Sequence, residues 1–354
     1  MKFPIEQMGS VRRTIMILAI LLCIPVFGFF LGPRPKLVYD QYEAPARIAG
    51  ELKAFLESLD AASSLSEFVA ALDQSVPLKD PMNRSRLRWF HGAETQTKLS
   101  VVYLHGFSAS PLDLHPTLDL VAESLQANLF QMRMTGHGLA DDGLNRATAA
   151  AWLEDAEKAR AIGKKLGQRT LLVGMSTGAS VAALSALRNS NNLAGLVLLS
   201  PNFGVVNPYA AVLTWPWGVN LASFVNGSAL HTWKPESELR DRLWTSRYSL
   251  EAAAQMQLVV DALNQADMSR IKLPTLFVHS NIDNVVNIET IKDRFFEWGS
   301  ALSAPEQIKG RVALEGSTRH ELAGNAVAPE LTTLLADTIV AFFKNVFEIG
   351  TEMK

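Results

Sequence analysis

Residues 174–178 read Gly-Met-Ser-Thr-Gly, and this segment constrains the fold more than any other part of the chain. The apolar run 170–173 before it is typical of a buried strand, and the alanine-rich pattern after it is typical of a helix. A corner tight enough to join them accepts only small neighbours, which the two flanking glycines and Ala179 provide. The segment therefore predicts a strand, a sharp turn and a helix, with Ser176 at the turn.

Strand and helix patterns alternate along the chain from about residue 85. Strand patterns fall at 86–90, 99–104, 129–132, 170–173, 195–199, 275–279 and 311–314. Helix patterns fall near 114–126, 147–166, 177–189, 288–298 and 329–347. This alternation predicts an α/β fold with a mostly parallel central sheet flanked by helices. Functional sites of such sheets lie beyond the carboxyl ends of the strands.

One long segment interrupts the alternation. From residue 203 to about 263 the chain shows helix-like stretches and no strand pattern. An insertion of this kind between two strands predicts a helical cap over the sheet edge. We expect most of its aromatic rings to fill the core of the cap and a minority to line a pocket. These rings belong to Trp215, Trp217, Phe224, Trp233, Trp244 and Tyr248.

The run 14–31 is almost wholly apolar and carries no charge. Its length suits a helix that crosses a hydrocarbon core of ~30 Å. Arg12 and Arg13 precede this run, and their positive charge favours a cytoplasmic location for the N-terminal residues 1–13. A cleaved signal peptide is the alternative, but its apolar part is usually shorter and ends in small residues. We therefore predict a transmembrane signal-anchor at 14–31 and a single-pass membrane protein whose body lies on the exported, periplasmic or extracellular side.

Residues 32–84 are predicted to form a helical stem before the main domain at 85–354. Apolar residues recur there at helical spacing and indicate a face that packs against the body. They are Ile48, Leu52, Phe55, Leu56 and Leu59. A net charge of −2 and a pI near 6.4 give no bias toward nucleic acid. The single cysteine, Cys23, rules out an intrachain disulfide.

A serine hydroxyl needs a base to become a good nucleophile at neutral pH, and the base needs a carboxylate that holds its tautomer. His320 lies in the last loop before the closing helix, where a base reaches over Ser176. Asp283 follows a buried strand and can point along the sheet edge toward that base. Asp267 precedes the same strand and would lie at the wrong end of the sheet. The other role open to Asp283 is that of a helix N-cap.

The oxyanion that forms when a serine attacks a carbonyl needs amide donors placed in advance. Thr177 follows the serine directly, and Phe107 lies in the loop after the strand pattern 99–104. His105 and Gly106 shape that loop. His137, in a Gly-His-Gly segment after the next strand, is expected to have a structural role because one base suffices.

Together these residues resemble the α/β-hydrolase superfamily, above all its carboxylesterase and monoacylglycerol-lipase-like branch, over roughly residues 85–347. The resemblance implies an α/β-hydrolase fold with a cap insertion at about 203–263. It also implies a catalytic triad of Ser176, Asp283 and His320, an oxyanion hole of Phe107 and Thr177, and neither cofactor nor metal. Many relatives carry Met or Gln where this chain has Thr177, so the hydroxyl alters the polarity of the pocket.

These features predict a membrane-anchored serine hydrolase that cleaves carboxylic esters through an acyl-enzyme. Acyl esters such as monoacylglycerol or lysophospholipid are the expected small-molecule substrates. An acyltransferase or thioesterase would use the same triad. The alternative from another class is a non-catalytic envelope protein that binds a lipid or a partner on a hydrolase fold. The completeness of the motif set favours the enzyme.

Overall fold

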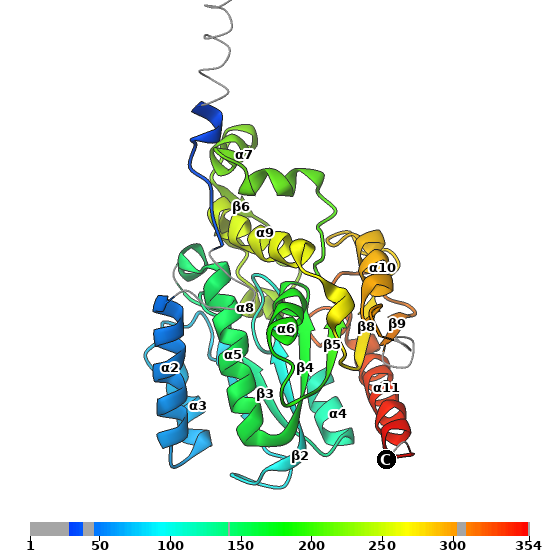
Figure 1. The fold of residues 1–354 in the computed structure, drawn as a ribbon. Coiled ribbons are helices and arrows are strands. Elements are labelled where there is room, and N and C mark those ends of the chain that lie inside the picture. Colours follow the sequence, from blue (N-terminus) through cyan, green and yellow to red (C-terminus); the bar gives the residue numbers. More distant parts are fainter. Residues whose placement is uncertain (1–27, 38–45, 141, 303–308, 353–354) are drawn as a thin grey trace, which may run out of the picture.

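A seven-stranded sheet forms the centre of the computed structural model, which describes residues 28–37, 46–140, 142–302 and 309–352 (Figure 1). The strand order is β1-β3-β2-β4-β5-β8-β9, and only β1 runs antiparallel to its neighbour. The strands are β1 (Arg86–Arg88), β2 (Thr97–Leu104), β3 (Asn128–Met132), β4 (Gly167–Met175), β5 (Leu193–Leu199), β8 (Thr275–His279) and β9 (Lys309–Ala313). The predicted mostly parallel α/β sheet is therefore confirmed.

The central strands are buried on both faces, which explains why they read as continuous apolar runs rather than alternating ones. Every residue of β5 and β8 is buried. The register pairs Leu104 of β2 with Gly174 of β4, and Met175 of β4 with Leu199 of β5. The carboxyl ends of these three strands consequently meet at one edge of the sheet.

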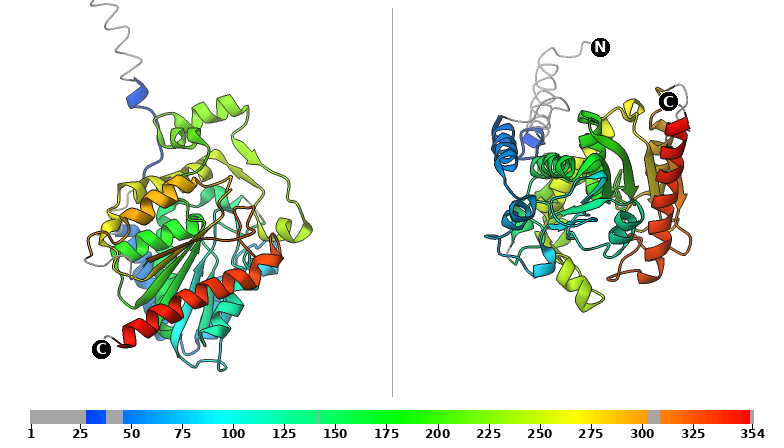
Figure 2. Two further views of the ribbon diagram at one scale, coloured as in Figure 1. Left: turned by 90° about the vertical axis from the view of Figure 1, so that its right-hand side faces the viewer. Right: turned by 90° about the horizontal axis from the view of Figure 1, so that it is seen from below.

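Helices cover both faces of the sheet (Figure 2). One apolar core lies beneath α5 (Ala149–Leu166), α6 (Thr177–Arg188), α9 (Leu250–Gln265) and α10 (Ile288–Glu297). The second core lies on the opposite face, beneath α4 (Thr117–Ser124) and α11 (Thr332–Glu352). Short 3₁₀ turns complete the body: η1 (Pro81–Asn83), η2 (Gly143–Arg146), η4 (Met268–Arg270) and η6 (Pro329–Leu331).

The stem consists of α2 (Ala46–Ala61), which packs against α5, and α3 (Leu65–Leu72), which packs against β1 (Figure 1). Leu59, Leu65 and Val69 are buried in the first core. Leu56 faces outward, although the sequence pattern placed it on the apolar face. The predicted packing of the stem against the body is confirmed for the residues nearest the end of α2.

The cap lies between β5 and β8, and Figure 1 shows most of it above the sheet. Before α9 it contains η3 (Pro208–Thr214), α7 (Gly218–Asn226), β6 (Leu230–Thr232), α8 (Glu238–Leu243) and β7 (Arg247–Ser249). The prediction that this segment has no strands is wrong, because β6 and β7 pair antiparallel. Strands of three residues are too short for a period of two to be visible in a sequence.

The aromatic rings of the cap also differ from expectation. Trp244 is buried, but Trp215, Trp217 and Phe224 are exposed and do not fill a core. The predicted signal-anchor lies outside the described residues except for 28–31, and the predicted N-terminal segment 1–13 lies wholly outside them. Within the described ranges, no helix combines the length and the apolarity that a membrane crossing requires.

Candidate active site

Ser176 occupies the corner between β4 and α6, as predicted. Its backbone angles, φ 52° and ψ −118°, lie in a region that non-glycine residues rarely adopt. The Ser176 N–H donates to the carbonyl of Leu199 at 2.8 Å, and its carbonyl accepts from Ala179 and Ser180 at the start of the helix. A strained serine held from both sides is the geometry that lifts a nucleophile out of a sheet edge.

Gly178 lets this corner approach the neighbouring strand. A Cβ at position 178 would lie 2.1 Å from the carbonyl oxygen of Leu104 and 2.4 Å from that of His105. Both are backbone atoms in the core. We expect Gly178→Ala to lower the free energy of unfolding by about 3 kcal/mol or more, as severe overpacking does. Denaturant titration of the purified variant measures this effect.

Gly204→Ala is the matched control for that measurement. The nearest atom to its added Cβ, Thr290 Oγ1, lies 3.4 Å away, so the change should cost less than about 1 kcal/mol. Equal stability of the two variants would contradict the tight corner.

Asp283 and His320 lie close together although they are distant in sequence. Nδ1 of the His320 ring is 2.8 Å from Oδ2 of Asp283, and both side chains are buried. The other carboxylate oxygen, Oδ1, accepts from the N–H groups of Val285 and Val286 at 2.8 and 3.0 Å. Because Nδ1 donates to the carboxylate, Nε2 of the ring is left as a proton acceptor. The N-cap of α10 is Asn287, so the alternative role for Asp283 is wrong.

The electrostatics of this pair suit a general base. Burial by itself disfavours the charged imidazolium, but the hydrogen bond and the charge of Asp283 outweigh it and raise the pKa of His320. Burial likewise opposes ionisation of Asp283, but the interaction with His320 and the hydrogen bonds from the N–H groups of Val285 and Val286 outweigh it and lower the pKa of Asp283. The pair therefore favours the imidazolium that forms when His320 takes a proton.

Ser176 and His320 are held at the end of the same strand. Ser176 donates its N–H to Leu199, and the hydroxyl of the next residue, Ser200, donates to the carbonyl of His320 at 2.7 Å. Ser176 Oγ has no hydrogen-bond partner among the described residues, His320 included. Catalytic hydrogen bonds of this type are often long or poorly aligned until substrate binds. His320 is thus hydrogen-bonded directly to Asp283. Ser176 is linked to His320 only indirectly, because both are hydrogen-bonded to the adjacent residues Leu199 and Ser200 at the end of β5.

The loop with Phe107 lies against the corner, since a Cβ built on Gly106 would be 3.4 Å from Cβ of Ser176. The backbone N–H groups of Phe107 and Thr177 donate to no group in the described part of the chain. Thr177 is the first residue of α6, where N–H groups have no partner inside the helix. Two unused amides therefore lie next to the serine, as an oxyanion hole requires.

His105 holds this loop in place. It is fully buried, and its Nε2 accepts from the N–H of Met134 at 3.1 Å. Nδ1 consequently carries the proton and donates to the carbonyl of Gly106 at 2.9 Å. Burial keeps the pKa of His105 well below its ordinary value, so the ring stays neutral.

His137 is also structural, as predicted. Its ring packs against the rings of His105, Phe107 and Trp152, and its Nδ1 lies 3.2 Å from the carbonyl of Thr135. Burial lowers the pKa of His137 to about 4.

Ion pairs tie the cap to the loop that carries His320. Arg240 of α8 pairs with Glu321 at 2.7 Å, and Arg319 pairs with Glu236 just before α8. Arg319 and Glu321 are the residues directly before and after His320 in the sequence. Sequence reasoning missed both pairs, because no local pattern links residues so far apart along the chain.

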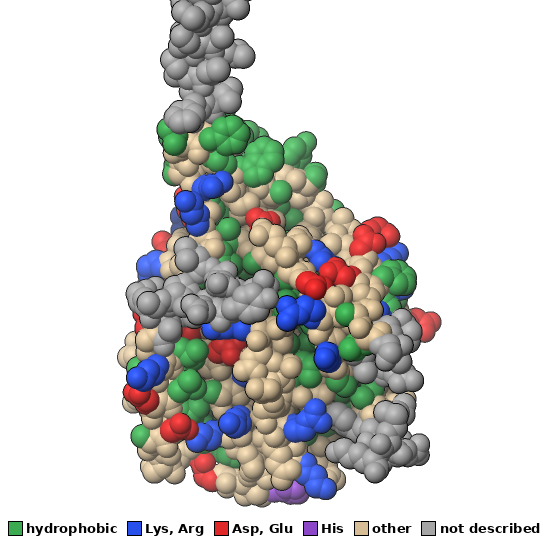
Figure 3. Space-filling model, in the orientation of Figure 1, with side chains coloured by type: hydrophobic (Ala, Val, Ile, Leu, Met, Phe, Trp, Pro, Cys, Tyr) green, Lys and Arg blue, Asp and Glu red, His purple; other side chains and the backbone are tan. Residues whose placement is uncertain are grey.

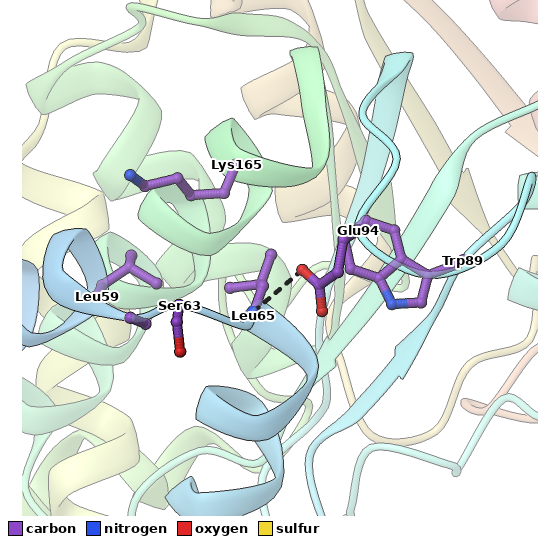
Figure 4. A pocket seen from close by; sticks show the side chains of 7 residues that line it. Leu59, Ser63, Leu65, Trp89, Glu94 and Lys165 are labelled. Carbon is purple, nitrogen blue, oxygen red and sulfur yellow. Dashed lines mark hydrogen bonds between the residues drawn. The ribbon is translucent and has the colours of Figure 1, made fainter.

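A cavity of about 180 Å³ lies at the opposite end of the sheet (Figure 4). Lys165, at the end of α5, lines it just before β4 begins, so it is near the amino ends of the strands. Its two charged side chains already have partners. Glu94 accepts from the N–H groups of Leu65 and Ser66, and Lys165 pairs with Asp60 at 2.7 Å. The cavity therefore has no part in the candidate site.

The sheet topology, the strained serine corner and the buried acid–histidine pair define an α/β hydrolase. The family model described as serine aminopeptidase, S33, matches residues 95–310, and the chain belongs to this family. The predicted superfamily is thereby confirmed. No cluster of His, Cys, Asp and Glu that could hold a metal ion occurs within the described ranges.

Solved structures share the fold at low sequence identity. A structure from work on the metagenome-derived lipolytic enzymes LipS and LipT has a TM-score of 0.58 and 18% identity, and the match covers 75% of this chain and 99% of that one. The monoacylglycerol lipase of Paleococcus ferrophilus has a TM-score of 0.55 and 15% identity, over 74% and 98% of the two chains. A soluble monoglyceride lipase variant from Saccharomyces cerevisiae has a TM-score of 0.55 and 12% identity, over 74% and 91%. No protein with a curated description matches the sequence.

Proposed function

We propose that the chain is a serine hydrolase that cleaves carboxylic esters through an acyl-enzyme. In this proposal Ser176 is the nucleophile, His320 the general base and Asp283 the carboxylate that orients it. The observation that carries the proposal is the buried hydrogen bond between His320 and Asp283, at the sheet edge where the strained serine lies. Membership of a serine hydrolase family supports the same chemistry.

The reaction proceeds in two halves. Nε2 of His320 takes the proton from Ser176 Oγ as that oxygen attacks the acyl carbonyl carbon. The N–H groups of Phe107 and Thr177 hold the oxyanion. The intermediate collapses, the ester C–O bond breaks, and His320 gives its proton to the leaving alcohol. Water then attacks the acyl-enzyme with His320 again as base, which releases the carboxylic acid and restores Ser176.

Acyl esters such as monoacylglycerol or lysophospholipid are the proposed substrates. Two supports are the aromatic cap segment and the similarity in fold to two lipases that act on monoacylglycerols, as their names state. A further part of the proposal is that residues 14–31 anchor the chain in a membrane by a single span, with the hydrolase body on the exported side. The support for this part is the uncharged apolar run that follows Arg12 and Arg13.

A fluorophosphonate probe tests the proposed chemistry, because it reacts with an activated serine and not with an ordinary one. We expect the wild-type protein to be labelled and Ser176→Ala to lose the label. Ser185→Ala changes a buried serine within α6, the helix that follows Ser176, and this variant should be labelled like the wild type. Folded wild-type protein that takes no label would favour the alternative of a lipid- or partner-binding protein without catalytic activity.

A further inference from the structure

An exposed apolar surface covers the outer part of the cap. Its large side chains, which we call the cap face, belong to Tyr209, Trp215, Trp217, Leu221, Phe224 and Val225. Phe224 is 85% exposed, Val225 77% and Tyr209 76%. Figure 3 shows hydrophobic side chains gathered at this end of the molecule, where Figure 1 places α7. Soluble monomers rarely expose so many large apolar side chains together, so a contiguous surface of this kind indicates a partner or a lipid phase.

The outer part of the cap, which carries the cap face, has no charged side chain. From residue 203 to 233 the chain has no Asp, Glu, Lys or Arg. Surfaces that face water are normally rich in these residues. Exposed Trp and Tyr side chains, with an apolar ring and one polar group, are instead enriched where a membrane meets water.

The cap face is bonded to the end of the uncharged N-terminal run. The N–H of Trp217 donates to the carbonyl of Pro33 at 2.8 Å, and its indole Nε1 donates to the carbonyl of Gly28 at 3.3 Å. Gly32 lies directly on this ring, since an added Cβ would be 1.9 Å from Nε1. Phe30 and Leu31 are exposed beside it. The last residues of the run 14–31 therefore lie against the cap face.

The inner part of the cap is held to the body instead. The N–H of Thr245 donates to the carbonyl of Ser108 at 2.7 Å, and Arg240 pairs with Glu321. The cap thus has an inner part bonded to the active-site loops and an outer part, η3 and α7, that presents apolar side chains to the outside. Arg34 and Lys36, both exposed, follow the N-terminal run directly and are suited to lipid headgroups.

We propose that the cap face lies in the lipid surface of the membrane in which residues 14–31 are anchored. The lipid bilayer is the partner that suits the cap face. If the run 14–31 anchors the chain, it leaves the membrane at Leu31, and the adjoining cap face is then held at the membrane surface. Apolar side chains and interfacial aromatic rings are stabilised there by transfer out of water. The inference rests on the proposed anchor and not on the proposed chemistry, so it can be tested without any activity measurement.

Site-specific fluorescence on the full-length chain tests the proposal. Cys23 is the only cysteine, so Cys23→Ala gives a background in which Phe224→Cys carries a single NBD label. The chain is reconstituted in phosphatidylcholine vesicles, with or without doxyl-labelled phosphatidylcholine as quencher. We expect a blue-shifted NBD emission at position 224 and strong quenching by the doxyl lipid. Val225→Cys provides a second label position on the same helix, with the same expectation.

Phe296→Cys is the matched control, since Phe296 is 67% exposed on α10 and is not part of the cap face. Its label should keep the emission of an aqueous dye and escape quenching. If positions 224 and 225 behave like 296 in vesicles that retain the protein on flotation, the proposal is overturned while the anchor stands. A blue shift without doxyl quenching also overturns it, because a second copy of the chain would then cover the face. Failure of the chain to float with the vesicles removes the anchor and the proposal together, and leaves fluorophosphonate labelling unaffected.

Discussion

Ser176→Ala should lower kcat for a p-nitrophenyl ester by a factor on the order of 10⁴ to 10⁶. The variant loses the oxygen that forms the acyl-enzyme, and only water activated near the free amides of Phe107 and Thr177 can then attack. Initial rates on purified protein, with circular dichroism to confirm folding, measure the change. Substrate binding does not use this oxygen before attack, so we expect KM to change much less than kcat.

The control is again Ser185→Ala, whose buried hydroxyl bonds to Glu157 far from the sheet edge. It should keep kcat within a few-fold of the wild type. A double variant with Ser176→Ala and His320→Ala should lose little more than the single variant, because residues of one catalytic unit are strongly non-additive. An unchanged rate in Ser176→Ala, or multiplicative losses in the double variant, would contradict the proposed triad.

Most of the sheet could be predicted from the sequence because its signals are local. The strand Thr275–His279 was predicted with the bounds that the structure shows, since a buried parallel strand is a short continuous apolar run. The signal for the corner at Ser176 is also local. Gly178 marks a position where the corner approaches the backbone of the neighbouring strand so closely that no larger residue fits. The closing helix was expected from residue 329, but Pro329–Leu331 forms a 3₁₀ turn and α11 begins at Thr332.

What could not be predicted depends on contacts between distant parts of the chain. The bond from Ser200 to the His320 carbonyl and the pair of Arg240 with Glu321 exist only once the cap and the last loops have folded together. The exposure of Phe224 was missed because an aromatic pattern gives no sign of which side meets solvent. Asp283 and His320 could be placed from the sequence only because strand ends in a parallel sheet share one edge.

Asp283→Asn should lower kcat by about 10⁴-fold while leaving the fold intact. The retained Oδ1 still accepts from the N–H groups of Val285 and Val286. The new amide nitrogen replaces Oδ2 and cannot accept from Nδ1 of His320. The ring then favours the tautomer with its proton on Nε2, which cannot take the proton of Ser176. Asp267→Asn is the matched control, because Asp267 caps η4 before β8 and should leave kcat unchanged.

The pH profile separates this role from a merely structural one. Only neutral His320 acts as base, so activity of the wild type should rise with pH through the pKa of His320, which Asp283 raises above the ordinary value of about 6.5. In Asp283→Asn the hydrogen bond and charge that raise this pKa are gone, and burial, which lowers it, then dominates. The acid limb of kcat/KM, measured on the residual activity, should therefore move to lower pH. A large loss of activity with an unmoved acid limb would mean that Asp283 supports the fold and does not set the charge state of the base.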